Sequence, residues 1–476
     1  MIVNSIIFWL FFTCVLVVYY GFCRKSSRWQ NVALLFASYV FYGLVDWGMC
    51  LLLLGATIAF YCLGIAIHIN IKSNPKHASF LTTLGVCLGA GLLVYFKYLN
   101  FFMDQFCIVL ELMGLNTNWN SFNIIMPLGI SFFTFKLIAY VIEVHRGNMP
   151  SSKDPVAFGV YVAFFPTIMS GPIDNPTKFI PQLERARMVD LSDVGEAFKR
   201  IIWGLFLKMC IADQISGYTT AVLGNYEHHN ATSVLLASFL YSIQIYTDFA
   251  GYSEMAIGTS RMLGISVMEN FNRPYFACSV TEFWKRWHIS LTKWLTYYVY
   301  ITLGGNRCSK LKQYRNIMAT FIVSGFWHGA NWTFVLWGGL HGLYQIIEKY
   351  AGISKIEGSN CLNGKKIIRI VITFVLITFN WVLFQAKSIQ DFFGTIGVLF
   401  SGFAIPYTSE SLNVFTFGIL SIFILLFKEF KDEQAKNWHF LHSKKAFIST
   451  TSFVLLVIYI LYVGQLDGGQ FIYFQF

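Results

Sequence analysis

The sequence G-F-W-H-G-A-N-W, from Gly325 to Trp332, lies in the middle of an unusually long apolar run. Residues 317–347 contain no Asp, Glu, Lys or Arg, although His328 and His341 lie among them. One helix of that length would measure about 46 Å at ~1.5 Å per residue, whereas the hydrocarbon core of a bilayer is about 30 Å thick. The sequence therefore predicts that the helix breaks at residues 329–331, and a histidine beside such a break is a candidate functional residue.

The composition of the whole chain indicates a membrane protein. Of its 476 residues, 56% are hydrophobic and only 12% are charged, whereas about 25% of the residues of a soluble protein are charged. The apolar segments predict an all-α polytopic fold with about eleven transmembrane helices, at ~20 residues for each span, together with re-entrant and interfacial helices. No soluble domain stands out, so residues 1–476 are expected to form a single membrane-embedded domain.

The formal charge of +11 comes from short basic clusters that separate apolar segments. Such clusters are typical of loops held in the cytoplasm, so the expected partner is the lipid bilayer and not nucleic acid. A multi-pass protein of the cell membrane, with its N-terminus outside, fits the first two clusters. The ten cysteines form no Cys-x-x-Cys pair and predict no metal site. The clusters after the first and third apolar segments are Arg24, Lys25 and Arg28, and Lys72, Lys76 and His77.

Polar residues at membrane depth are the candidates for chemistry, because the sequence contains no common hydrolase, zinc-peptidase or nucleotide-binding motif. His328 is the first of them. Its neighbours Trp327 and Trp332 would provide a low-dielectric environment that favours a neutral imidazole able to act as a base. The alternative is a core histidine bonded to a backbone carbonyl. For His341, whose neighbours are small, helix packing is the better interpretation.

A second candidate, His288, lies in T-E-F-W-K-R-W-H-I-S, from Thr281 to Ser290. If residues 281–293 form one helix, Glu282 and Arg286 pair at i,i+4 and His288 turns inward from an interfacial position. The alternative is an ordinary interfacial helix whose histidine bonds a lipid phosphate.

Two carboxylates, Asp248 and Glu254, lie within a further apolar segment. Intramembrane carboxylates are costly unless they are paired or hydrated. They could form a proton or ion relay or the polar framework of a tunnel. They could equally be buried partners of Arg261, Lys208 or another base.

Taken in order, these motifs resemble the membrane-bound O-acyltransferase (MBOAT) family, in the bacterial branch that includes the alginate O-acetyltransferases. The resemblance covers almost the whole chain, with a core at about residues 120–350. The motifs that carry it are M-P-L-G-I-S-F-F-T-F (126–135), F-F-P-T-I-M-S-G-P-I (164–173), Q-I-Y-T-D-F-A-G-Y-S-E-M-A-I-G (244–258), N-F-N-R-P-Y (270–275), F-W-K-R-W-H-I-S-L (283–291), L-G-G-N-R (303–307), F-W-H-G-A-N-W (326–332), F-N-W-V-L-F (379–384) and F-I-Y-F-Q-F (471–476).

The resemblance implies that His328 is the essential membrane histidine and His288 a second functional position. We expect neutral His328 to act as general base, and His288 to orient the acceptor or to donate to the developing oxyanion. Both would face a central tunnel, with Trp327, Asn331, Asp248 and Glu254 contributing to its framework. An acyl group from a cytoplasmic thioester would pass to a hydroxyl on the outer side, for O-acetylation of a polysaccharide. A separate extracytoplasmic acetyltransferase would be the partner protein.

Acetyl-CoA, or another acyl thioester, is the expected donor, and no permanently bound cofactor is expected. The basic side chains of Lys285, Arg286 and Arg307 could hold its phosphates, although topology alone would explain many of the basic residues. The chain departs from the family pattern at residues 296–298 and 301–303, which read T-Y-Y and I-T-L in place of Arg-Asp-Tyr and Ile-Pro-Leu.

Two other functions remain open at this point. Within the family, the chain could transfer D-alanine from a carrier protein to teichoic acid. In a different class, it could be a proton-coupled polysaccharide or solute transporter, with Asp248, Glu254 and His328 as the proton path.

Overall fold

A computed structural model shows a helical chain, and its described residues contain no strand. They group into two compact units, which we treat separately: unit 1 holds residues 1–194 and 259–268, and unit 2 holds residues 195–258 and 269–476. The residues that the structure describes are 3–44, 46–117, 119–188, 190–353, 364–408, 412–434, 441, 443, 445–466, 469 and 471–472.

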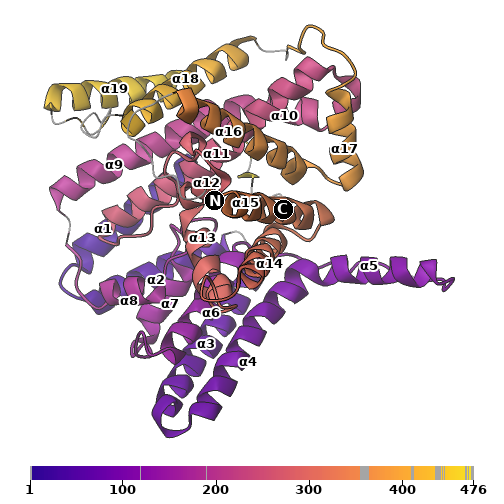
Figure 1. Cartoon of the computed structure of the whole chain (residues 1–476). Helices are drawn as coiled ribbons and strands as arrows, with labels where there is room; N and C mark the ends of the chain where they lie inside the picture. The colour runs from indigo at the N-terminus through magenta and orange to yellow at the C-terminus, as the bar shows by residue number, and fades with distance from the viewer. Residues whose placement is uncertain are drawn as a thin grey trace. The chain divides into compact units, whose positions relative to one another are not determined.

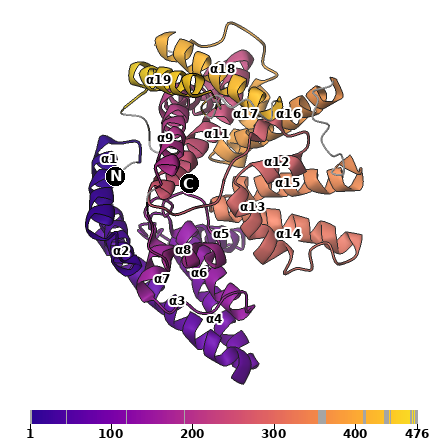
Figure 2. The ribbon, with the colours of Figure 1, turned by 90° about the vertical axis from the view of Figure 1, so that its left-hand side faces the viewer.

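Unit 1 is built around a helical hairpin formed by α3 and α4, which run side by side in Figures 1 and 2. A Cβ at Gly64 on α3 would lie 2.4 Å from the Tyr140 ring, and one at Gly89 on α4 would lie 2.7 Å from Cγ1 of Ile138. The two glycines therefore let α6 pack directly against the backbones of the hairpin. The helices of unit 1 are α1 (Ile6–Val17), α2 (Ser27–Gly43), α3 (Trp47–Ser73), α4 (Pro75–Leu93), α5 (Leu99–Leu112), α6 (Ile130–His145), α7 (Pro155–Ala163) and α8 (Pro176–Leu183).

Four helical segments in the described part of the chain are long and apolar enough to cross a membrane. A shorter apolar helix, Ile6–Phe22, accompanies them. These segments confirm the prediction of an all-helical membrane protein. The expected number of about eleven spans and the central tunnel stay predictions. The four candidate spans are Trp47–Ser73, Pro75–Leu112, Gly364–Gln385 and Ala446–Val463.

Unit 2 contains the remaining helices and both candidate histidines. In it, α18 and α19 lie side by side in both ribbon views. The four terminal residues of the motif F-I-Y-F-Q-F, 473–476, lie outside the described residues. The helices, counting those shared in part with unit 1, are α9 (Leu191–Leu205), α10 (Asp213–Leu223), α11 (Ala231–Met262), α12 (Val280–Arg286), α13 (Ile289–Leu295), α14 (Lys310–His328), α15 (Trp332–Tyr350), α16 (Gly364–Gln385), α17 (Ile389–Val398), α18 (Leu412–Gln434) and α19 (Ala446–Val463).

The charge-free run around His328 folds as two helices, α14 and α15, which lie alongside each other in Figure 2. The predicted break at residues 329–331 is confirmed. His328 is the last residue of α14, and Asn331 caps α15 by accepting a hydrogen bond from the Thr333 N–H at 3.0 Å. The helices cross where Gly325 and Gly338 meet, since a Cβ at Gly325 would lie 2.2 Å from the Phe334 carbonyl oxygen.

The prediction of one helix over residues 281–293 is wrong. The chain forms α12, leaves the helical conformation at Trp287 and His288, and resumes as α13. His288 has a left-handed backbone with φ 41°, which costs roughly 1–2 kcal/mol for a residue with a Cβ. The predicted ion pair of Glu282 with Arg286 is present at 2.6 Å, because both residues lie on α12 before the break.

Replacement of Gly338 by alanine should destabilise the protein, because the new Cβ would lie 2.2 Å from the Phe321 carbonyl oxygen. Overpacking of this kind costs about 1–3 kcal/mol. We expect a melting temperature several degrees below that of the wild type for the purified protein in detergent. The matched control is Gly339→Ala, whose Cβ would meet nothing within 4 Å. Equal melting temperatures for the two variants would contradict the close helix crossing.

Candidate active site

His288 is held by the side chain of Asn270, which comes from the segment that precedes α12. The Asn270 Oδ1 atom lies 3.1 Å from His288 Nδ1 and also accepts hydrogen bonds from Ser290, at 3.3 Å from its N–H and 2.9 Å from its hydroxyl. The Ile289 N–H donates to the Asn270 carbonyl at 2.9 Å. These bonds satisfy backbone groups at the start of α13 that a helix N-terminus leaves free, and they stabilise the left-handed turn.

The same contacts determine which nitrogen of His288 carries the proton. The Ser290 N–H can only donate, so the Asn270 atom that it meets is an oxygen and the His288 Nδ1 must be protonated. The other nitrogen, Nε2, then has a free lone pair, and it is buried with no hydrogen-bond partner among the described residues. Burial lowers the pKa of His288, which lies outside the candidate spans, to about 3. The ring is therefore neutral near pH 7, and Nε2 is able to accept a hydrogen bond.

His288 and His328 both contact the ring of Trp327. The ring centroids of His288 and Trp327 are 5.7 Å apart, and those of Trp327 and His328 are 4.9 Å apart. Trp337 and Phe384 close the other sides of His328 at 5.0 and 5.2 Å. His328 is 4% exposed, and both of its ring nitrogens are shielded from solvent. The structure thus brings the two predicted histidines into one cluster of packed aromatic rings.

His341 extends this aromatic cluster away from His328. Its ring lies 4.8 Å from that of Trp337, and its Nδ1 accepts a hydrogen bond from the indole N–H of Trp284 at 3.2 Å. This hydrogen bond fixes the orientation of both the His341 ring and the Trp284 ring. These contacts agree with a packing role for His341.

The carboxylates of Asp248 and Glu254 are both paired with basic side chains. Asp248 Oδ1 lies 2.7 Å from the Lys208 ammonium group, which also contacts Asp213 at 2.8 Å. Asp248 Oδ2 accepts the Ile472 N–H at 2.7 Å, which attaches the C-terminal segment to α11. Glu254 lies 3.3 Å from the Arg200 guanidinium. Of the alternatives that the sequence left open, the geometry favours ion pairs, which are buried for Asp248 and partly exposed for Glu254.

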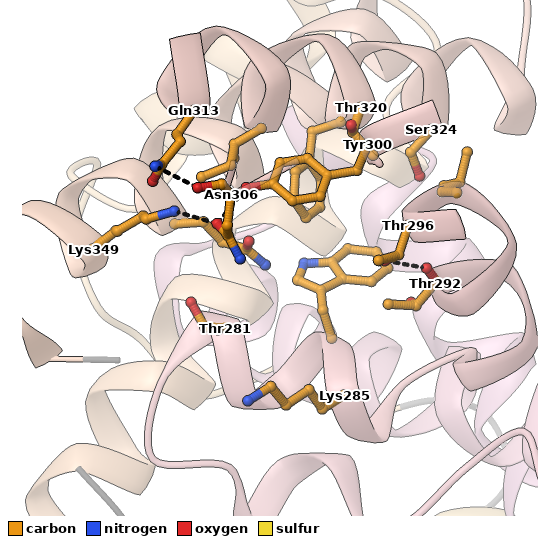
Figure 3. Close-up of a pocket in the computed structure, with 15 residues that line it drawn as sticks. Thr281, Lys285, Thr292, Thr296, Tyr300, Asn306, Gln313, Thr320, Ser324 and Lys349 are labelled. Carbon is orange, nitrogen blue, oxygen red and sulfur yellow. Dashed lines mark hydrogen bonds between the residues drawn. The ribbon is translucent and has the colours of Figure 1, made fainter. Parts of the chain in front are cut away.

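A cavity of about 570 Å³ opens beside the aromatic cluster, between α12, α13, α14 and α15. Figure 3 shows Lys285 and Lys349 on its wall, with the ammonium group of Lys349 directed at Asn306. That ammonium donates to Asn306 Oδ1 at 2.9 Å. At another part of the wall is Ser324, which is buried, has an Oγ with no hydrogen-bond partner among the described residues, and lies one helical turn before His328. The cavity therefore reaches the helix that carries His328.

The three basic residues predicted to hold a donor are in different environments. Lys285 lines the cavity. Arg286 is paired with Glu282 and Glu433, and Arg307 is exposed and is not among the residues that line the cavity. Thr296, at the place where the chain departs from the family pattern, lies on the cavity wall. No cluster of three or more potential metal ligands occurs in the described part of the chain.

Some residues of this site were absent from the sequence prediction. Asn270 opens the motif N-F-N-R-P-Y and could have been found there, but only its contact with His288 assigns it a role. Lys349 and Ser324 lie in α15 and α14 and belong to no recognised motif. Glu433 carries no sequence signal, because it acts on residues far away in the chain.

Comparison with known proteins shows the family of this chain. Residues 149–390 match the model of the membrane-bound O-acyltransferase family. The chain belongs to that family. The matched region contains α12, the break at His288, the cavity and the helix break at His328.

Named relatives narrow the activity. The probable alginate O-acetylase AlgI of Pseudomonas syringae pv. tomato is 36% identical over 84% of this chain and 74% of that protein. The peptidoglycan O-acetyltransferase of Helicobacter pylori is 32% identical over 77% of this chain and 73% of that protein. A teichoic acid D-alanyltransferase of Bacillus subtilis is 32% identical over 56% of this chain and 70% of that protein. The chain is a membrane-bound O-acyltransferase, and its relatives favour acetyl over D-alanyl transfer.

Replacement of Asn270 by alanine should impair acyl transfer, because it leaves the His288 Nδ1–H and the Ser290 N–H without their acceptor. A buried polar group that loses its partner costs about 1–3 kcal/mol, which corresponds to roughly a 5- to 150-fold loss in rate if it falls on the transition state. The readout is the rate of acetyl transfer per mole of folded protein. Ser253→Ala is the control, since Ser253 accepts a hydrogen bond from the Asn270 amide NH₂ and not from its Oδ1. Equal rates for the two variants would contradict the role of Oδ1.

Proposed function

We propose that this protein transfers an acetyl group from a cytoplasmic acyl thioester to a hydroxyl group of an extracytoplasmic polysaccharide. The observation that supports this most is the convergence of His288 and His328 on the ring of Trp327. Two buried imidazoles among aromatic rings provide the groups that acyl transfer requires, a proton acceptor and a polar group that orients the attacking hydroxyl.

In this mechanism neutral His328 is the general base. It takes the proton from the acceptor hydroxyl as the hydroxyl oxygen attacks the thioester carbonyl carbon. The carbon–sulfur bond then breaks, and the imidazolium returns the proton to the sulfur, so that the donor leaves as a thiol. A positioned base of this kind typically contributes ~10²- to 10⁴-fold to the rate. His288 orients the acceptor by accepting a hydrogen bond at Nε2. It does not donate to the oxyanion, because its proton is on Nδ1.

The cavity beside α14 is the proposed site of the donor, for which acetyl-CoA is the candidate. Lys285 and Lys349 on its wall suit the phosphates of such a thioester. The polar side chains of Thr320 and Ser324 continue along α14 towards His328, which suits the amide-containing arm of a thioester. Trp327 and Asn331 belong to the surroundings of the reacting groups, and Asn331 also donates to the Lys387 carbonyl at 2.8 Å.

The acceptor side of the proposal follows the named relatives. Alginate and peptidoglycan, after which two of these relatives are named, are both polysaccharides that lie outside the cytoplasm. A separate extracytoplasmic acetyltransferase is the proposed partner, and the cell membrane with the N-terminus outside is the proposed location. D-alanyl transfer from a carrier protein is the second candidate, because the relative in Bacillus subtilis is a teichoic acid D-alanyltransferase.

A deletion strain complemented with either the wild type or His328→Ala tests the proposal. Ester-linked acetate on extracted surface glycans should return only with the wild type, because the variant lacks the general base. His77→Ala, a change of an exposed histidine in the first turn of α4, is the control and should restore acetate fully. Acetate at the wild-type level with His328→Ala, at normal protein abundance, would refute the role of His328. Acetate unchanged by deletion of the gene would refute acetyl transfer, and D-alanine esters would be measured next.

The double variant Lys285→Gln, Lys349→Gln should raise the KM for acetyl-CoA about tenfold while changing kcat little. Each lysine attracts the donor phosphates equally strongly in the ground state and in the transition state. Loss of such an interaction raises KM and leaves kcat unchanged. The matched control is Lys310→Gln, Lys312→Gln, which removes two charges of α14 that do not line the cavity. An equal KM for both double variants would contradict the assignment of the cavity to the donor.

A further inference from the structure

Two residues near the site have a backbone conformation that is unusual for residues with a Cβ. Arg273 has φ 46° and His288 has φ 41°, and they are the only non-glycine residues with positive φ in the described part of the chain. Left-handed backbone at such residues persists only where surrounding contacts determine it. The contacts around both residues therefore show what holds the site in shape.

The two residues belong to neighbouring segments that are hydrogen-bonded to each other. The Asn272 N–H donates to the Arg286 carbonyl at 2.9 Å, and the Ile289 N–H donates to the Asn270 carbonyl at 2.9 Å. We call residues 270–273 together with residues 286–289 the histidine turn. A displacement of either segment would move the Asn270 oxygen relative to His288 and so change the orientation of the imidazole ring.

One carboxylate, that of Glu433 near the end of α18, contacts the arginines of both segments. Arg286 donates through Nη1 and Nη2 to the two Glu433 oxygens, at 3.1 Å each. Arg273 Nε lies 3.2 Å from the same carboxylate. Arg286 also donates to the Arg273 carbonyl at 3.4 Å, so Glu433, Arg273 and Arg286 form one connected group.

This group is partly shielded from water, which strengthens its contacts. The Glu433 side chain is 10% exposed and that of Arg286 is 16% exposed. Burial would raise the pKa of Glu433, but the hydrogen bonds and charge of Arg286 and the charge of Arg273 outweigh it and hold that pKa below its ordinary value. Glu433 is thus ionised near pH 7, and a bidentate arginine–carboxylate pair fixes geometry as well as charge.

The other carboxylates at this end of α18 make different contacts. Asp432 pairs with Lys428 on the same helix at 2.8 Å, and Glu429 accepts a hydrogen bond from the Tyr246 hydroxyl. Among the described residues of α18, only Glu433 forms ion pairs with both segments of the histidine turn. The link from α18 to the histidine turn is therefore specific to one side chain.

We propose that Glu433 is a positioning residue for acyl transfer, which holds Arg273 and Arg286 together and thereby fixes the left-handed turn that orients His288. This inference rests on the proposed function of His288. Glu433 itself does not take part in proton transfer. Its role is to connect α18 with the break at His288, in a stretch that the sequence alone predicts as one helix.

Glu433→Gln is the test variant, because it removes the charge and keeps the size of the side chain. Hydrogen exchange of the purified full-length protein, followed by mass spectrometry of peptides that cover residues 270–289, reports on the histidine turn independently of activity. We expect the amides of Asn272 and Ile289 to exchange at least tenfold faster than in the wild type. Asp432→Asn, which removes a carboxylate of the same helix, is the matched control and should exchange as the wild type does.

Kinetics of acetyl transfer provide the second readout. Glu433→Gln should lower kcat about tenfold and leave the KM for acetyl-CoA within twofold, because the donor cavity is not altered. Glu433→Asp, which retains the charge, should have a kcat at least threefold higher than that of Glu433→Gln. It also tests the inference should the glutamine variant fold poorly.

Two results would overturn the inference. One is unchanged exchange and turnover for Glu433→Gln in a preparation whose wild type is active. The other is faster exchange throughout α14 and α15 with a lowered melting temperature for both Glu433 variants, which would indicate a general structural role. A wild type that transfers no acetyl group would instead overturn the proposed function, and the exchange of Asn272 and Ile289 would still report whether Glu433 holds the turn.

Discussion

The hydrogen bonds to one oxygen atom, Oδ1 of Asn270, determine the conformation of the site. This atom accepts from the backbone and the hydroxyl of Ser290 and from Nδ1 of His288. Because the group is buried, loss of any of these bonds would leave a polar atom without a partner, at a cost of about 1–3 kcal/mol. The strained turn at His288, its tautomer and the direction of its free lone pair all follow from this interaction.

The second half of the site depends on close packing of backbones. Gly325 and Gly338 let α14 and α15 cross with no side chain between them, and the chain breaks immediately after His328. The imidazole therefore lies at a helix end, among Trp327, Trp337 and Phe384, where water is excluded. Electrostatic interactions are stronger in such low-dielectric surroundings than in water, and we therefore propose His328 as the general base.

The parts of the fold that local physics controls could be predicted from the sequence. The break at residues 329–331 follows from a charge-free run longer than the bilayer is thick, and the Glu282–Arg286 pair follows from helix periodicity. The helix over residues 281–293 was predicted wrongly, because Asn270, 18 residues before His288, supplies the bonds that stabilise its turn. For the same reason the sequence could not show that Arg286 also pairs with Glu433, which is 147 residues away. Long-range contacts of this kind leave no periodic pattern.

The central claim is that an acyl thioester reaches His328 through the cavity lined by Lys285 and Lys349. The most direct measurement is an electron cryomicroscopy structure of the full chain with a thioether analogue of acetyl-CoA, which cannot transfer its acetyl group. We predict density for the phosphates beside the two lysines, with the acetyl carbonyl carbon next to His328, where a hydroxyl hydrogen-bonded to the imidazole can attack it. Density for the analogue at another surface, with the cavity empty at saturating concentration, would contradict the claim.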